Sequence, residues 1–183
     1  MQMQKQQGVG LIEVLVALFI LIIAVLGFVG LQVRAIEASQ DAIFKTQAIQ
    51  LMQSLSESMR VNNTAKASYV TDINSYLSSI SKPTASINCN KNLCTPAQLS
   101  VFESYAIARQ ASIQGVQLGV ATCPGIATST VSLEKRLCIF AVWKNTELSV
   151  SAGALNYSNC MPSSGDSAGI YVSSSNCLMM ESY

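Results

Sequence analysis

Glu13 is the first residue whose type and position suggest chemistry. It lies near the start of an otherwise apolar stretch that runs from Leu11 to Leu31. A carboxylate inside a membrane costs roughly 2–3 kcal/mol when it is central, and less near the interface. Carboxylates in such positions usually have a partner of opposite charge, so the sequence predicts a cationic partner for Glu13.

Cysteines form the second group of residues that could do chemistry. Their number is even and they avoid the apolar stretch, which indicates disulfides made in an oxidising compartment. A zinc site is the alternative, but only the first two have a spacing near that of zinc ligands, so no metal is expected. Of the fifteen pairings that the sequence leaves open, we prefer the most local one. It joins Cys89 to Cys94, Cys123 to Cys138, and Cys160 to Cys177.

Catalytic side chains are scarce. The sequence has no histidine, which removes the commonest general base and the commonest metal ligand. The segment Ser132-Leu133-Glu134-Lys135 matches the Ser-x-x-Lys motif of serine enzymes, but their two companion motifs are absent and we interpret it as a loop. A net charge of +1, from 11 basic and 10 acidic residues, argues against nucleic acid as a partner. We predict neither catalysis nor a cofactor.

The apolar stretch indicates a membrane anchor. At about 1.5 Å per residue, a helix from Leu11 to Leu31 would span the roughly 30 Å hydrocarbon core. Lys5 precedes it and no basic cluster follows it, so the N-terminus is expected in the cytoplasm and the rest outside. No Ala-x-Ala cleavage site follows Leu31, so the helix should stay attached. A plain signal anchor remains the alternative, but it leaves Glu13 unexplained.

The junction before the apolar stretch resembles a known processing signal. The block Gly8-Val9-Gly10-Leu11-Ile12-Glu13 is similar to the class III leader junction of type IV pilins and pseudopilins. The resemblance implies that a prepilin peptidase cuts after Gly8 and methylates the new N-terminus at Val9. Glu13 then becomes the fifth mature residue. Major pilins usually have Phe where Val9 stands, and many have a proline near Gly30, which this chain lacks.

Processing would supply the cation that Glu13 needs. Cleavage before Val9 creates an α-amino group that is positively charged at neutral pH. A Glu13 carboxylate about 4 Å from the amine of a neighbouring subunit would gain about 4 kcal/mol at an effective dielectric near 20. That gain would offset the desolvation of Glu13 and fix the axial register of an added subunit. The sequence therefore favours an assembly role for this carboxylate.

The chain beyond the anchor continues the helical pattern. Apolar residues recur at helical spacing to Met59, and neither glycine nor proline interrupts residues 32–60. We predict a leader at 1–8, a membrane-spanning half helix at 9–31, an amphipathic half at 32–60 and a periplasmic head at 61–183. Gly27 and Gly30 are the positions where the helix could bend.

The head has mixed helix and strand signals. A short helix is expected around Tyr69–Ile80, and a second from Thr95, with Gln98 completing a capping box, to Ser112. Its predicted buried face holds Leu99, Phe102 and Ala106. Strands are predicted at Val116–Ala121, Leu137–Trp143 and Ala168–Val172. The expected fold is α+β, the type IV pilin fold, in which a long helix packs on a small antiparallel sheet.

Two features resemble one subgroup, the PilV-type minor pilins: the Glu13–Leu18 run and the Cys138–Lys144 strand, with a cysteine-rich loop after it. The resemblance implies a subunit that moves from the inner membrane to the pilus and helps to initiate it near the tip. Its implied partners are the prepilin peptidase, the major pilin, other minor pilins and a tip adhesin. A minor pseudopilin of type II secretion and a signal-anchored periplasmic sensor or enzyme are the alternatives.

Overall fold

The computed structural model describes residues 10–80, 87–125 and 136–182. The chain divides into two compact units, residues 1–43 and residues 44–183. Gly8 and Val9, the predicted processing residues, lie outside the described residues. The Ser132–Lys135 motif also lies outside them.

One long helix, α1 (Leu11–Val61), passes through both units, and it is unbroken at Gly27 and Gly30. Proline is absent from it, and leucine, alanine and isoleucine dominate its first half, so little opposes the helix. In the first unit the helix buries none of its large apolar side chains. In the second unit α1 buries one face, formed by Ala48, Leu51, Met52, Leu55 and Met59. The long N-terminal helix is confirmed.

Two further α-helices follow α1 among the described residues of the second unit. A 3-10 turn (η1, Asn63–Ala65) leads into α2 (Lys66–Ser75), which begins and ends earlier than the sequence predicted. The next helix, α3 (Pro96–Ile113), has the predicted bounds to within a residue. Its capping box is also confirmed. The Gln98 amide donates to Thr95 Oγ1 at 3.3 Å, and the Thr95 amide donates to Gln98 Oε1 at 3.0 Å.

An antiparallel sheet has the strand order β1 (Val116–Thr122), β2 (Leu137–Trp143) and β5 (Cys177–Ser182). A separate two-stranded hairpin is formed by β3 (Ser149–Ser151) and β4 (Ala154–Asn156). The predicted β1 and β2 are confirmed. β5 and the hairpin were not predicted from the sequence.

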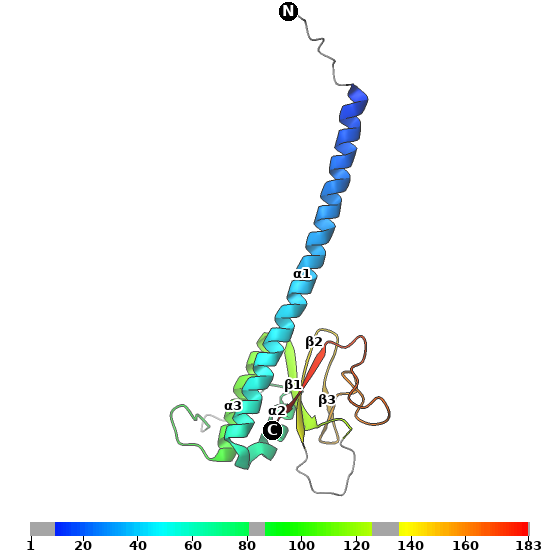
Figure 1. The fold of residues 1–183 in the computed structure, drawn as a ribbon. Helices are drawn as coiled ribbons and strands as arrows, with labels where there is room; N and C mark the ends of the chain where they lie inside the picture. Colours follow the sequence, from blue (N-terminus) through cyan, green and yellow to red (C-terminus); the bar gives the residue numbers. More distant parts are fainter. Residues whose placement is uncertain (1–9, 81–86, 126–135, 183) are drawn as a thin grey trace, which may run out of the picture. The chain divides into compact units, whose positions relative to one another are not determined.

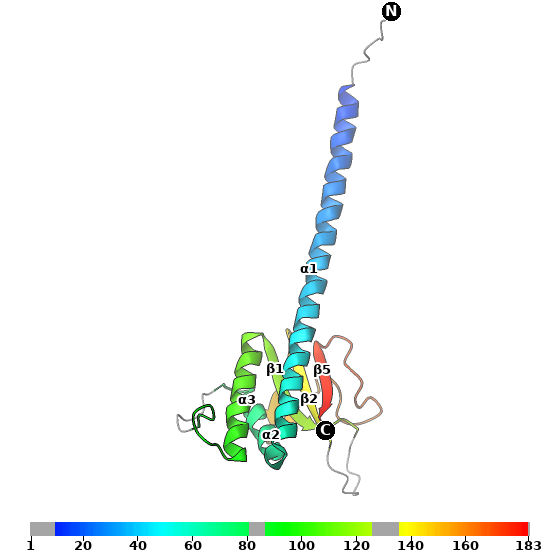
Figure 2. The same cartoon turned by 60° about the vertical axis from the view of Figure 1, so that its left-hand side comes forward.

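The sheet separates two cores in the second unit. On one face lie α2, α3 and the end of α1 (Figures 1 and 2). Ile139, Ala141 and Trp143 are buried in the core on this face. On the other face, the hairpin and the following loop cover Phe140, whose ring stacks on Tyr157 with centroids 4.2 Å apart. The observed fold is therefore the α+β fold expected of type IV pilins: a long helix and a small antiparallel sheet.

The strand predicted at Ala168–Val172 is wrong. Gly165 and Gly169 have φ angles of 84° and 78°, and the chain between them forms turns. The Gly169 amide donates to the Pro162 carbonyl at 3.1 Å, which folds this segment back on itself. Residues 170–172 therefore stay exposed although their side chains favour strands.

The buried face predicted for α3 is also wrong. Its buried residues are Ser100, Ser104, Ile107, Ala108 and Ala111. The exposed position is Ala106, while Leu99 and Phe102 are only half-buried. Small side chains on the buried face let α2 and α3 approach closely, so helix packing outweighs side-chain hydrophobicity here.

Candidate functional site

The first candidate site is Glu13, in the first turn of α1. Its amide donates to the Gly10 carbonyl at 2.9 Å, so the helix is already formed at this residue. An acidic side chain in the first turn interacts favourably with the helix dipole. Among the described residues, the side chain of Glu13 has no hydrogen bond or ion pair. Its carboxylate is therefore available to a group supplied from outside this part of the chain.

The surface around Glu13 is apolar on every side. Exposed fractions in this part of α1 include 84% for Leu11, 60% for Phe19 and 72% for Leu31. By length and composition, α1 is the one helix of the described residues that could cross a membrane. So much apolar surface is unfavourable in water, and it requires lipid or neighbouring helices to cover it.

Three disulfides cross-link the head. Cys89 is bonded to Cys94, Cys123 to Cys138, and Cys160 to Cys177, with Cα atoms 5.5, 4.9 and 5.6 Å apart. These are the pairs that the most local arrangement gives. The second and third disulfides are buried against the Phe140 side of the sheet. The first is half-buried and closes a short loop directly before α3.

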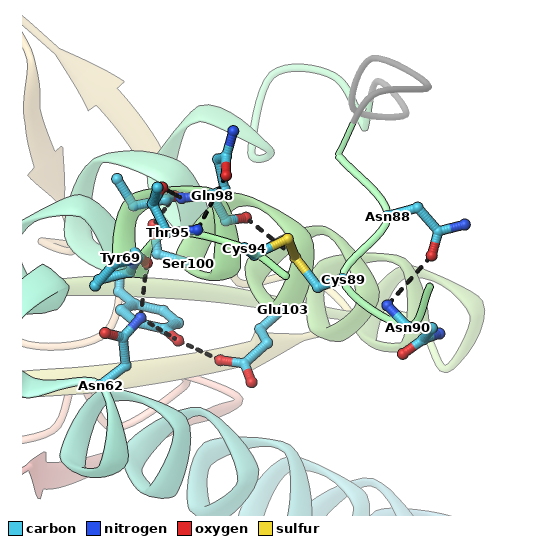
Figure 3. Close-up of a disulfide and its surroundings, with 12 residues drawn as sticks. Asn62, Tyr69, Asn88, Cys89, Asn90, Cys94, Thr95, Gln98, Ser100 and Glu103 are labelled. Atoms are coloured by element: carbon cyan, nitrogen blue, oxygen red, sulfur yellow. Dashed lines mark hydrogen bonds between the residues drawn. A yellow bond between two sulfur atoms is a disulfide. The ribbon is translucent and has the colours of Figure 1, made fainter. Parts of the chain in front are cut away.

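A polar network beside the first disulfide joins the helices. Tyr69 donates its hydroxyl hydrogen to the Glu103 carboxylate, and Asn62 donates to the Tyr69 oxygen at 3.4 Å (Figure 3). Asn62 also donates to the Pro96 carbonyl at 2.7 Å. These bonds connect the end of α1 to both α2 and α3. They hold the start of α3, and thus the adjoining disulfide loop, in a fixed place.

Titration in this network is governed by burial. Burial raises the pKa of the Tyr69 hydroxyl, and the bond to Glu103 raises it further, while Asn62 acts in the opposite direction. Burial also raises the pKa of the Asp72 carboxyl, which the hydroxyl of Ser100 partly offsets by donating to it at 2.6 Å. Tyr69 therefore remains a hydrogen-bond donor at neutral pH. The hydrogen bonds of these groups join the helices of the head to one another.

Sequence reasoning missed one buried residue that organises the head. Asn74 of α2 donates to the Val120 carbonyl at 2.8 Å and accepts from the Val120 amide at 2.9 Å. Its carboxamide thus makes the two bonds that a neighbouring strand would make, and it covers the outer edge of β1. The only sequence signal was an asparagine within a helix, which does not reveal its partner.

No group of three or more His, Cys, Asp or Glu side chains among the described residues could hold a metal ion. Each of the six cysteines is bonded to another.

Comparison with known protein families gives two adjoining matches. Residues 30–105 match a family described as type IV pilin Tt1218. Residues 3–29 match the prokaryotic N-terminal methylation motif, which includes the predicted cleavage site and Glu13. Neither match alone covers half of the chain. No curated protein and no solved structure matches the chain at a significant level.

The two matches, taken with the fold, support the type IV pilin superfamily for this chain, and a role as a pilin subunit. Pilins are structural proteins and not enzymes. The methylation motif implies processing by a prepilin peptidase. Together with the apolar helix, it fits a subunit that is anchored in the membrane first and lies in a pilus afterwards.

Proposed function

We propose that this chain is a minor pilin that helps to initiate a type IV pilus and lies near its tip. The observation that carries the proposal is Glu13. Its carboxylate lies in the exposed apolar first part of α1 and has no partner among the described residues. An α-amino group of a neighbouring subunit, released by cleavage after Gly8, has the charge and the depth in the membrane to pair with it.

Each successive segment of the chain has its own proposed role. Residues 1–8 are the leader, residues 9–31 span the inner membrane, and residues 32–60 continue the helix toward the periplasmic head at 61–183. N-methyl-Val9 would be the first residue of the mature subunit. Its partners would be the prepilin peptidase, the major pilin, other minor pilins and an adhesin at the tip. A PilV-type role is supported by the resemblance of the Cys138–Lys144 strand and of the cysteine-rich loop after it.

The processing step is tested by the mass and N-terminal sequence of the full chain from its host. The measurement is repeated in a strain without the prepilin peptidase. We expect the chain to begin at N-methyl-Val9 only when the peptidase is present. A chain that begins at Met1 in both strains would indicate a signal-anchored periplasmic protein. The α-amino group at Val9 that is proposed to pair with Glu13 would then not exist.

The role of Glu13 is tested by Glu13→Gln, which keeps the shape of the side chain and removes its charge. We expect normal insertion in the inner membrane but about tenfold less incorporation into pili, because the pairing with the amine is lost. Glu37→Gln is the matched control, because Glu37 is exposed in the same helix and pairs with Arg34 at 3.3 Å. Equal incorporation of both variants would contradict the charge-pairing proposal.

A minor pseudopilin of type II secretion remains the second candidate, because the same Glu13–Leu18 run is common in that class. A deletion strain separates the two candidates. Loss of piliation and twitching with normal secretion supports the pilus role. Loss of secretion with normal pili supports the secretion role.

A further inference from the structure

The strand β5 forms one outer edge of the three-stranded sheet, next to β2 (Figure 2). The Trp143 amide in β2 donates to the Asn176 carbonyl, directly before β5, at 3.1 Å. Because alternate residues of an antiparallel pair bond to the same neighbour, Leu178 and Met180 bond to β2, and Met179 directs its backbone groups outward. An outer edge of this kind can pair with a strand of another chain.

A tyrosine hydroxyl occupies this edge. The Met179 amide donates to the hydroxyl oxygen of Tyr171 at 2.9 Å, so the amide has the acceptor that a neighbouring strand would otherwise supply. The opposite edge of the sheet has an equivalent, because the Asn74 carboxamide bonds to both backbone groups of Val120. Each outer edge is therefore met at one position by a side chain that takes the place of a strand.

The two edge side chains differ in how firmly they are held. Asn74 is 8% exposed and lies within α2. Tyr171 is 45% exposed and lies in the loop before β5, between the exposed residues Ile170 and Val172. Packing alone therefore does not fix the Tyr171 ring, and its position depends on the loop that carries it.

One hydrogen bond and one disulfide hold that loop against β5. The Val172 amide donates to the Cys160 carbonyl at 2.9 Å. A disulfide joins Cys160 to Cys177, which is the first residue of β5 and lies two positions before Met179. The residue after Tyr171 is thus tied to the start of the strand that Tyr171 contacts. A side chain that is held near its partner loses less entropy when the contact forms.

We propose that Tyr171 is a cap on the edge of β5, held by the Cys160–Cys177 disulfide, which prevents two copies of this chain from pairing through their sheets. The strand that the cap excludes is β5 of a second copy. Residues 177–181 are identical in both copies, so two uncapped edges can pair antiparallel with Met179 opposite Met179. Each edge would then satisfy the outward backbone groups of the other. With the cap in place, contacts between copies are left to other surfaces.

Tyr171→Phe in the full chain, in detergent micelles, tests the cap, because it keeps the ring and removes the acceptor. Hydrogen exchange of the Met179 amide should become about tenfold faster. Exchange of the Met180 amide, which bonds to β2, should be unchanged and serves as the internal reference. The test requires neither cleavage at Gly8 nor the charge of Glu13, so its failure would leave the proposed function untouched.

The same variant should also associate more strongly than the wild type, because its edge is open. We expect at least about tenfold tighter self-association in sedimentation velocity. Exchange of the Met179 amide locates the contact, because it should slow again as the concentration of Tyr171→Phe rises.

Tyr105→Phe is the matched control. Tyr105 is a half-buried tyrosine of α3, and its hydroxyl has no hydrogen bond among the described residues. The variant therefore loses a tyrosine hydroxyl from the same head without opening an edge. Its association and its Met179 exchange should equal those of the wild type.

Replacing both Cys160 and Cys177 by serine tests what holds the cap. The measurement is the ratio of Met179 exchange to Met180 exchange, at a temperature where the variant stays folded. The ratio is used because global unfolding exposes both amides, whereas loss of the cap exposes only the first. We expect it to rise as it does in Tyr171→Phe. An unchanged ratio would overturn the role of the disulfide.

Two results would overturn the cap itself. One is equal exchange of the Met179 amide in Tyr171→Phe and in the wild type, which would mean that another group shields this amide. The other is faster exchange without added association at any concentration, which would mean that the open edge does not pair with a second copy.

Discussion

Residues 11–43 and residues 44–183 use apolar side chains in opposite ways. In the first unit the apolar residues of α1 point outward in all directions, and Phe19 and Leu31 are 60% and 72% exposed. In the second unit they gather on the two faces of one sheet, where Phe140 and Ile139 are completely buried. The first unit therefore depends on lipid or on other helices for its burial, while the second carries its own core.

The difference explains why the cross-links lie where they do. All three disulfides are in the second unit, outside the helix that would enter the membrane. A head displayed in an oxidising compartment must hold its fold without lipid, and disulfides help small domains to do so. The helix needs no such support, because its backbone hydrogen bonds are satisfied along its own length.

The largest effect should come from a matched pair of phenylalanine truncations. Phe140→Ala removes a completely buried ring that stacks on Tyr157, and we expect a loss of about 3–5 kcal/mol in the free energy of unfolding of the head. Phe19→Ala removes an exposed ring, so the same measurement should barely change. Urea unfolding of the full chain in detergent, followed by Trp143 emission, measures both. Equal losses would mean that the two units are not independent.

Disulfide removal should have the next largest effect. Replacing Cys160 and Cys177 by serine opens a loop with a sequence separation of 17, and chain entropy alone gives a loss of about 3 kcal/mol. The same change at Cys89 and Cys94, where the separation is 5, should cost about 2 kcal/mol. Urea midpoints of the two double variants give the order. The reverse order would show that strain or residual unfolded structure dominates.

Local sequence signals predicted the elements that do not depend on distant partners. The helix α1, the strand β2 and the Thr95 capping box each follow from a few consecutive residues, and all were found. The Glu13 site was visible because a carboxylate in an apolar stretch is conspicuous before any folding. The predicted cleavage at Gly8 and the role of Glu13 remain predictions.

The failures have a different physical origin. Residues 170–172 have side chains that suit a strand, yet Gly165 and Gly169 direct the chain into turns. The strand β5 was missed because Leu178, Met179 and Met180 lie in a short run whose strand character comes from pairing with β2. Similarly, Ser100 is buried in α3, and its hydroxyl donates to Asp72 of α2 at 2.6 Å, a distant partner that no local pattern reveals.

A smaller effect is expected at the edge of the sheet. Asn74→Ala removes both bonds to the Val120 backbone and leaves a buried amide and carbonyl without partners. We expect a loss of about 1–3 kcal/mol in the free energy of unfolding. Hydrogen exchange gives a second measurement, because the Val120 amide should lose protection while amides of residues 11–43 keep theirs. Unchanged protection at Val120 would show that another group covers this edge.

The smallest effect concerns pH and should also be confined to the head. Burial raises the pKa of the Asp72 carboxyl above its ordinary value of 3.8, so the folded head binds this proton more tightly than the unfolded chain does. The free energy of unfolding should therefore decrease as pH rises from about 3.8 through the raised pKa, and then level off.

Asp72→Asn tests this pH dependence. The asparagine side chain keeps an oxygen that can accept from the Ser100 hydroxyl, but it cannot ionise. It should remove this part of the slope and stabilise the head slightly at neutral pH. Urea unfolding at several pH values compares the variant with the wild type. Parallel curves for the two proteins would assign the pH dependence to other carboxylates.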